Sequence, residues 1–150
     1  MQGMTRSLIA RVCAAVVLAA CLVSGLATGT RDAAAQVEEV AADSDLEFGD
    51  SAGDADLAGT AVVSPAEVKT VTGGVFDFGG GVKAGLFVIV TQNDGDPYSC
   101  TLPSSITITA GGNTATVDTF TANPPLSGNL PGNDNELEIF IGGTFRVVAG

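Results

Sequence analysis

The chain lacks several residue types on which common catalytic and binding sites depend. Its 150 residues include no histidine and no tryptophan, and only one tyrosine. Without histidine, no unperturbed side chain serves as a general base near neutral pH, and zinc loses its commonest nitrogen ligand. No nucleophile motif of the type Gly-x-Ser-x-Gly occurs either. We therefore expect a protein that is not an enzyme, with no catalytic residues and no cofactor.

Basic residues are also scarce. Six lysines and arginines stand against 17 aspartates and glutamates, which gives a formal net charge of −11. This charge repels nucleic acids and anionic lipid, and the basic patch of a nucleic-acid-binding protein is missing. The low aromatic content also disfavours a stacking platform for sugars. We expect no nucleic-acid partner.

Cysteine is limited to three positions, Cys13, Cys21 and Cys100. The first two lie in an apolar N-terminal stretch, so Cys100 would be the only cysteine of a chain that has lost that stretch. We therefore expect no intramolecular disulfide in the mature protein. Because Cys100 alternates with Tyr98 and Leu102, we interpret it as a small buried hydrophobic residue.

The N-terminal stretch has the features of an export signal. Two arginines precede an uninterrupted apolar run at residues 12–26, and three alanines follow at 33–35. This order predicts a signal peptide over residues 1–35, forming an N-terminal signal helix, with cleavage between Ala35 and Gln36. The apolar run is shorter than the roughly 18 residues of a membrane-spanning helix, so we expect no membrane span in the mature form. The mature protein would then reside in the periplasm, on the surface or outside a bacterium.

An alternative processing site lies at Cys21. Residues 18–21 read Leu-Ala-Ala-Cys, which is similar to a bacterial lipobox, and lipidation of Cys21 would tether the protein to a membrane. Against this alternative, Leu22 and Val23 continue the apolar run, whereas lipoproteins usually become polar at that point.

The rest of the chain has the pattern of an all-β protein. Short runs of alternating or β-branched residues are separated by Gly, Pro, Asn and Asp, and no helical period is convincing. The strongest run is 86–91, LFVIVT, whose density of Val and Ile predicts a strand that is buried on both faces. Residues 50–58 and 123–135 have the composition of loops. Strands are expected at residues 46–48, 60–63, 68–72, 86–91, 98–102, 106–109, 114–120, 137–141 and 144–148.

These strands predict an antiparallel, immunoglobulin-like or pilin-like β-sandwich of about eight strands. We assign the sandwich to residues 45–150 and an acidic N-terminal segment to residues 36–44.

Acidic loops provide the only candidate metal ligands. Asp94 with Asp96, and Asp134 with Glu136, lie in Asp/Asn-rich stretches of the kind that supply oxygen ligands to calcium. Neither stretch fits the twelve-residue calcium-loop signature, and turn chemistry explains most of these residues. Glu136 and Glu138 would share one face of a strand, where we interpret them as a polar surface rather than as a catalytic pair.

Six stretches of the chain resemble, in order, a bacterial family catalogued as domain of unknown function 4402. Members of that family are exported proteins with an immunoglobulin-like or pilin-like sandwich. The resemblance transfers no catalytic residues to this chain. The similar stretches are residues 45–49, 59–65, 72–75, 87–91, 98–109 and 141–144.

The same resemblance implies one further strand after the Gly-Gly-Thr stretch, and the sequence stops at Gly150 before it. Two explanations stay open. The chain is a fragment or early stop of a longer gene, or another chain supplies the strand, as in donor-strand complementation of pilins.

The functional expectation is an exported structural or adhesive surface protein, similar to a fimbrial subunit. Its partners would be copies of itself or another surface subunit, joined through an edge strand. The alternative is a secreted ligand- or calcium-binding β-sandwich module, which a calcium-dependent shift in melting temperature would favour.

Overall fold

The computed structural model describes residues 20–22, 37–54, 56–91, 95, 97–110, 113–131 and 136–149. All regular structure in these residues is β-strand, which confirms the all-β prediction. The signal helix expected before Gln36 falls largely outside this set. The strands are β1 (Ala20–Leu22), β2 (Val37–Ser44), β3 (Glu47–Phe48), β4 (Ser51–Gly53), β5 (Gly59–Val63), β6 (Lys69–Gly73), β7 (Val75–Asp77), β8 (Val82–Lys83), β9 (Gly85–Thr91), β10 (Pro97–Thr101), β11 (Ser105–Ala110), β12 (Asn113–Asn123), β13 (Ser127–Asn129) and β14 (Glu136–Val147).

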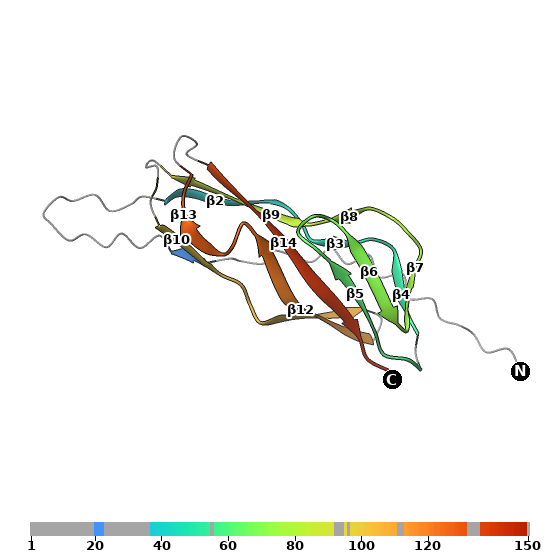
Figure 1. Ribbon diagram of the computed structural model, residues 1–150. Helices are drawn as coiled ribbons and strands as arrows, with labels where there is room; N and C mark the ends of the chain where they lie inside the picture. Colours follow the sequence, from blue (N-terminus) through green and yellow to red (C-terminus); the bar gives the residue numbers. More distant parts are fainter. Residues whose placement is uncertain are drawn as a thin grey trace, which may run out of the picture.

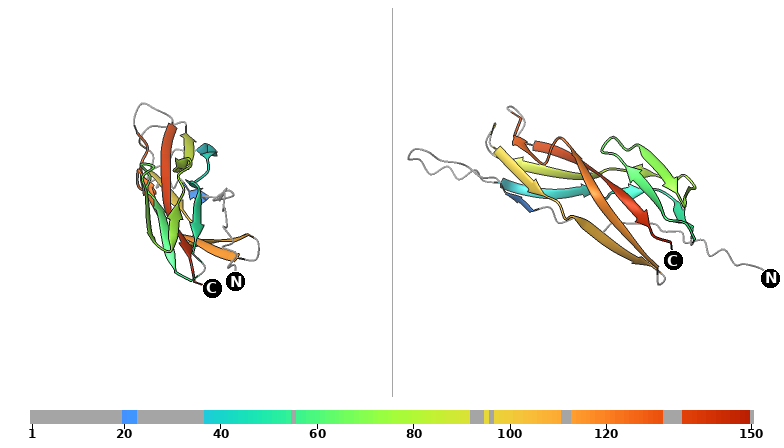
Figure 2. Two further views of the ribbon diagram at one scale, coloured as in Figure 1. Left: turned by 90° about the vertical axis from the view of Figure 1, so that its right-hand side faces the viewer. Right: turned by 60° about the horizontal axis from the view of Figure 1, so that its bottom comes forward.

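One large antiparallel sheet forms the first layer of the sandwich. Its strand order is β11-β12-β14-β5-β6, and β14 also pairs with β9, which in turn pairs with β2. Figure 1 shows β14 running diagonally along the elongated molecule, and the end-on view of Figure 2 shows how narrow the molecule is across that direction. The strands β6, β2 and β11 therefore end the pairing of this sheet within the described residues.

Strand β14 lies inside the large sheet and pairs with three other strands. One of its edges pairs with β12, and its other edge pairs first with β9 and then with β5. We predicted two strands here, separated by Gly142-Gly143, and that prediction is wrong because the strand is continuous. The glycines permit close approach instead of a turn, since a Cβ on Gly142 would collide with the carbonyl oxygen of Val63.

Three small antiparallel sheets form the second layer: β1-β10-β13, β3-β8 and β4-β7. Two of these strands, β4 and β13, lie in segments that we predicted as loops, so both predictions are wrong. Their residues, Ser-Ala-Gly and Ser-Gly-Asn, carry no apolar alternation. Pairing with β7 and with β10, rather than local preference, makes them strands.

The described part of the acidic segment, residues 37–44, belongs to the sheet. Residues Val37–Ser44 form β2, whose register along β9 shifts twice. The sandwich therefore begins before Asp45.

Strand β9 is buried on one face only, which corrects the prediction of burial on both. Phe87 and Ile89 are buried, whereas Leu86, Val88 and Val90 on the opposite face are half-buried. Its two neighbours, β14 and β2, protect the edges, and the second layer covers a single face.

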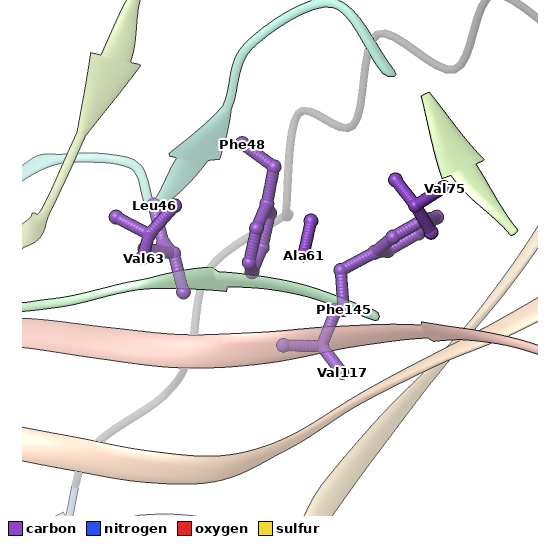
Figure 3. Close-up of a cluster of buried hydrophobic side chains, with 7 residues drawn as sticks. All are labelled: Leu46, Phe48, Ala61, Val63, Val75, Val117 and Phe145. Atoms are coloured by element: carbon purple, nitrogen blue, oxygen red, sulfur yellow. The ribbon is translucent and has the colours of Figure 1, made fainter. Parts of the chain in front are cut away.

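The space between the layers holds two apolar clusters. The first contains the aromatic pair Phe48 and Phe145, whose ring centroids lie 5.7 Å apart, and Figure 3 shows its seven side chains converging above β5 and β14. The second lies under β10 and includes Ile89 and Ile139. Phe120 packs against both clusters and joins them into one core.

Candidate functional surfaces

The candidate calcium ligands are only partly described. Asp94, Asp96 and Asp134 lie outside the described residues. Glu136 is exposed at the start of β14, and Glu138 is exposed on the same face, as the alternation predicted. Within the part of the chain that the structure describes, no three acidic or cysteine side chains gather as a metal site.

A charged cluster ties β12 to β14. The Nε of Arg146 donates to both carboxylate oxygens of Asp118, at 2.8 and 2.7 Å, and the Thr119 hydroxyl donates to Asp118 Oδ1 at 2.8 Å. These hydrogen bonds, first that of Arg146 and then that of Thr119, lower the pKa of Asp118 below its ordinary value. The cluster lies where the register shifts and where Thr119 has a positive φ of 51°. We assign it a structural role in holding that bulge.

A second ion pair joins β6 to β7. Lys69 Nζ donates to Asp77 Oδ1 at 2.7 Å, and the side chain of Lys69 is only 6% exposed. The bond from Lys69, followed by one from the Gly79 backbone N–H, lowers the pKa of Asp77. Lysine on an edge strand commonly discourages pairing with other chains. Here Lys69 is engaged with Asp77 instead.

Exposed apolar side chains are neighbours of this second ion pair in the sequence. Val68 precedes Lys69, and Phe76 and Phe78 stand on either side of Asp77 in sequence; these three apolar side chains are 61%, 52% and 68% exposed. We call Val68, Phe76 and Phe78 the β7 patch. Single exposed apolar residues are ordinary, but two exposed phenylalanines close together in the sequence are a candidate contact surface. The sequence analysis did not identify this patch.

Strand β10 places Tyr98 and Cys100 on its buried face, as predicted, with Ser99 and Thr101 exposed. The Tyr98 hydroxyl donates to the carbonyl oxygen of Pro125 at 2.7 Å, and burial raises the pKa of Tyr98. Cys100 is buried, as we expected, and in the full chain it is disulfide-bonded. The backbone register sets Cys21 opposite Cys100, whereas the expectation of no disulfide concerned the mature chain without residues 1–35.

The structure describes only part of the segment that carries the predicted processing signals. The cleavage site at Ala35 and Gln36 lies outside the described residues. The backbone of Cys21, the alternative lipidation site, is part of β1. None of the described segments forms a helix of the length and apolarity that a membrane crossing requires.

Comparison with known proteins gives one finding. No curated protein and no solved structure matches the chain. The model of one family, described as a domain of unknown function (DUF4402), matches residues 39–150, which include all strands from β3 onward and most of β2. The protein therefore belongs to the DUF4402 family.

Proposed function

We propose that this protein is an exported, non-enzymatic structural or adhesive subunit of a bacterial surface, similar in role to a fimbrial subunit. In this proposal residues 1–35 direct export, and the sandwich contacts copies of itself or another surface subunit. The β7 patch is the observation that carries the proposal, because its two exposed phenylalanines beside a sheet edge offer apolar area that a partner would cover.

The geometry of the β7 patch supports a contact between proteins. The 2.7 Å bond from Lys69 to Asp77 pairs the charge of Asp77, the residue between the two phenylalanines in the sequence. It also holds β7 next to β6, the last strand of the large sheet. A partner would therefore meet an apolar face and a strand edge together. Covering the exposed parts of Phe76 and Phe78 removes on the order of 200 Å² from water, which is worth about 5 kcal/mol as an upper bound.

The charge of the chain sets how such an association responds to salt. Without residues 1–35 the chain keeps three basic and 16 acidic residues, a net charge of −13, so its copies repel one another, and salt screens that repulsion within about 10 Å at 0.1 M ionic strength. The apolar contact itself does not weaken with salt. We therefore expect self-association to strengthen as ionic strength rises.

Sedimentation velocity of the purified protein at several concentrations and salt levels tests the proposal. The double substitution F76S/F78S should weaken association by at least about tenfold, because aromatic residues at contact centres usually contribute more than 1.4 kcal/mol. The matched control is Val40→Ser, an exposed apolar residue on β2, far from β7. Its association should equal that of the wild type.

Two outcomes contradict the proposal. The first is a protein that stays monomeric at every concentration and salt level and that binds no other surface protein. The second is equal association of the F76S/F78S variant and the wild type. Melting curves of all variants confirm that the exposed substitutions leave the fold intact.

A further inference from the structure

The edge strand β11 lacks the features that usually prevent a strand from pairing with another chain. Within the described residues β11 pairs with β12 alone, and the right-hand view of Figure 2 shows β11 on the outside of the β11–β12 hairpin. Natural edge strands commonly carry lysine, other charges, proline or a bulge, each of which discourages edge-to-edge pairing. Strand β11 reads Ser-Ile-Thr-Ile-Thr-Ala, and its register along β12 is unshifted over all six residues.

The two other strands that end the described pairing of this sheet are charged. Strand β6 begins with Lys69, and β2 contains three acidic residues and shifts its register twice along β9. Residues 97–117, which include β11, contain no charged side chain, and Asp118, which follows them, is bonded to Arg146. Two acidic copies of the chain can therefore meet at β11 with little repulsion at the contact itself.

The register of the hairpin determines which backbone groups of β11 face outward. Ala110 and Asn113 are paired across two intervening residues, and a pair at that spacing is of the hydrogen-bonded kind. Hydrogen-bonded pairs recur at every second residue of an antiparallel ladder, so Ile108 and Ile106 also exchange hydrogen bonds with β12. The alternate residues direct their backbone N–H and C=O groups to the outer edge; they are Ser105, Thr107 and Thr109.

The side chains of β11 form two uniform faces. Ile106 and Ile108 are half-buried and pack against the first core cluster. Ser105, Thr107 and Thr109 are exposed on the opposite face. A strand that continues the sheet beyond β11 must present apolar side chains on the first face and polar side chains on the second. A second copy of β11 meets that requirement and is also uncharged.

A two-fold axis at Thr107 matches two copies of β11 to each other. It sets Thr107 against its own copy and Ser105 against Thr109, so all the outward backbone groups of β11 find partners. It also sets Ile106 against Ile108 on the core side, as a non-hydrogen-bonded pair, the closer kind. Pairs of Thr with Thr or Ser are among the favourable cross-strand pairs on the solvent side.

We propose that two copies of this protein join antiparallel through β11, related by a two-fold axis at Thr107, so that their large sheets become one continuous sheet. The inference goes beyond the proposed function. Strand β11 lies at one end of the order β11-β12-β14-β5-β6, and the β7 patch lies beside β6 at the other. The contact through β11 requires neither the β7 patch nor export.

Backbone amide exchange, measured residue by residue by NMR at low and high protein concentration, tests the site. The F76S/F78S variant is used, because it removes contacts through the β7 patch. In the monomer the outward amides of β11 face solvent, and in the pair they are hydrogen-bonded. We expect exchange of these amides to slow at least about tenfold at high concentration. The amides concerned are those of Ser105, Thr107 and Thr109.

Substitution of Thr107 in the same variant separates backbone pairing from other contacts. Thr107→Pro removes the central outward N–H, which donates nothing to β12, and proline is tolerated at such edge positions. Thr107→Val keeps the N–H and a β-branched side chain, and is the matched control. Sedimentation velocity should show association at least about tenfold weaker for Thr107→Pro than for Thr107→Val, because the central pair loses its hydrogen bonds.

Thr107→Lys is a second test that does not alter the backbone. Two positive charges would face each other across the axis, and like charges directly opposite destabilise a strand pair. Asn129→Lys adds the same charge at an exposed position on β13, in another sheet, and is its control. Association should weaken at least about tenfold for Thr107→Lys and should not weaken for Asn129→Lys. Melting curves confirm that each variant is folded.

Three outcomes would each overturn the inference. They are exchange of the outward amides that does not depend on concentration, equal association of Thr107→Pro and Thr107→Val, and equal association of Thr107→Lys and Asn129→Lys. These outcomes are separate from failure of the proposed function, which equal association of the wild type and F76S/F78S would show.

Discussion

Adding one methyl group to Gly142 should destabilise the protein, although glycine to alanine usually favours a strand. A Cβ at residue 142 would collide with the carbonyl oxygen of Val63. It would also lie 2.8 Å from both the Ser64 carbonyl carbon and the Thr121 hydroxyl oxygen. These atoms belong to chain segments on both sides of β14, so no single movement relieves the contacts.

The magnitude follows from how far the neighbours must move. Ordinary contacts of a Cβ begin at 3.4 Å, so atoms now at 2.8 Å must retreat by about 0.6 Å, and the Val63 carbonyl by more. Overpacking of this kind costs typically about 1 to 3 kcal/mol. Alanine also restricts the unfolded chain, which stabilises the folded state by about 0.4 to 1 kcal/mol. The net loss of unfolding free energy for Gly142→Ala is therefore roughly 1 to 2 kcal/mol. Typical domains have only about 5 to 15 kcal/mol in total.

Gly81→Ala is the matched control. The nearest heavy atom to its new Cβ is Glu47 Oε2 at 3.9 Å, an ordinary contact. Urea unfolding followed by circular dichroism should show a lower midpoint for Gly142→Ala. For Gly81→Ala we expect an unchanged or slightly higher midpoint, with equal slopes throughout. Equal midpoints for the two variants would refute the continuous β14 with close neighbours on both edges.

Further predictions concern the core, the titrating groups and metal. Phe145→Ala should lower the free energy of unfolding by about 3 to 5 kcal/mol in urea titrations, because it empties the centre of the first core cluster; a loss under 1 kcal/mol would contradict that packing. Burial raises the pKa of Tyr98, so the folded state should lose stability as pH rises above 10.0 toward the raised pKa. Tyr98→Phe should remove this alkaline loss, measured as unfolding free energy from pH 9 to 11, and an unchanged slope would count against a buried phenol. The lowered pKa of Asp118 contributes stability above the ordinary aspartate pKa of 3.8, and this stability disappears as pH falls through the lower folded-state pKa. Asp118→Asn should reduce this loss of unfolding free energy at acid pH, and Asp77→Asn provides an independent comparison. The same acid-pH loss in wild type and Asp118→Asn would argue against the Arg146 bond. Melting with calcium and with a chelator should give the same temperature, whereas a calcium-dependent rise would favour the alternative binding module.

Local pattern explains which strands could be predicted from the sequence. The alternation of Tyr98, Cys100 and Leu102 correctly indicated their shared face, and the Val-rich run correctly indicated β9. Residues 98–102 carry a period-2 signal, and residues 86–91 carry a dense run of β-branched residues. The short strand β13 has no such signal, because its existence depends on pairing with β10.

Non-local contacts also explain the error at Gly142 and the disulfide at Cys100. A Gly-Gly pair is found both in turns and in strands whose backbone lies close to its neighbours, so the pair alone does not distinguish the two structures. Only the approach of Val63 and Thr121 distinguishes the two cases. Likewise, the register of β1 on β10, which brings Cys21 opposite Cys100, has no signature in either segment.

The side chains around β7 face the opposite way from what the alternation of apolar and polar residues predicts. Residues 75–78 read Val-Phe-Asp-Phe, in which alternation would place both phenylalanines inward and Asp77 outward. The structure instead buries Val75, bonds Asp77 to Lys69 and exposes Phe76 and Phe78. The core contacts of Val75 and the Lys69–Asp77 bond both accompany this orientation, and both join segments that propensity treats separately.

Photo-crosslinking in the bacterium that makes the protein addresses the role of the β7 patch in its own setting. A benzoylphenylalanine at position 78 should give adducts with copies of this protein or with another surface protein, whereas the same group at position 40 should not. Adducts at neither position, or equal adducts at both, would contradict a surface subunit that makes its contacts through β7.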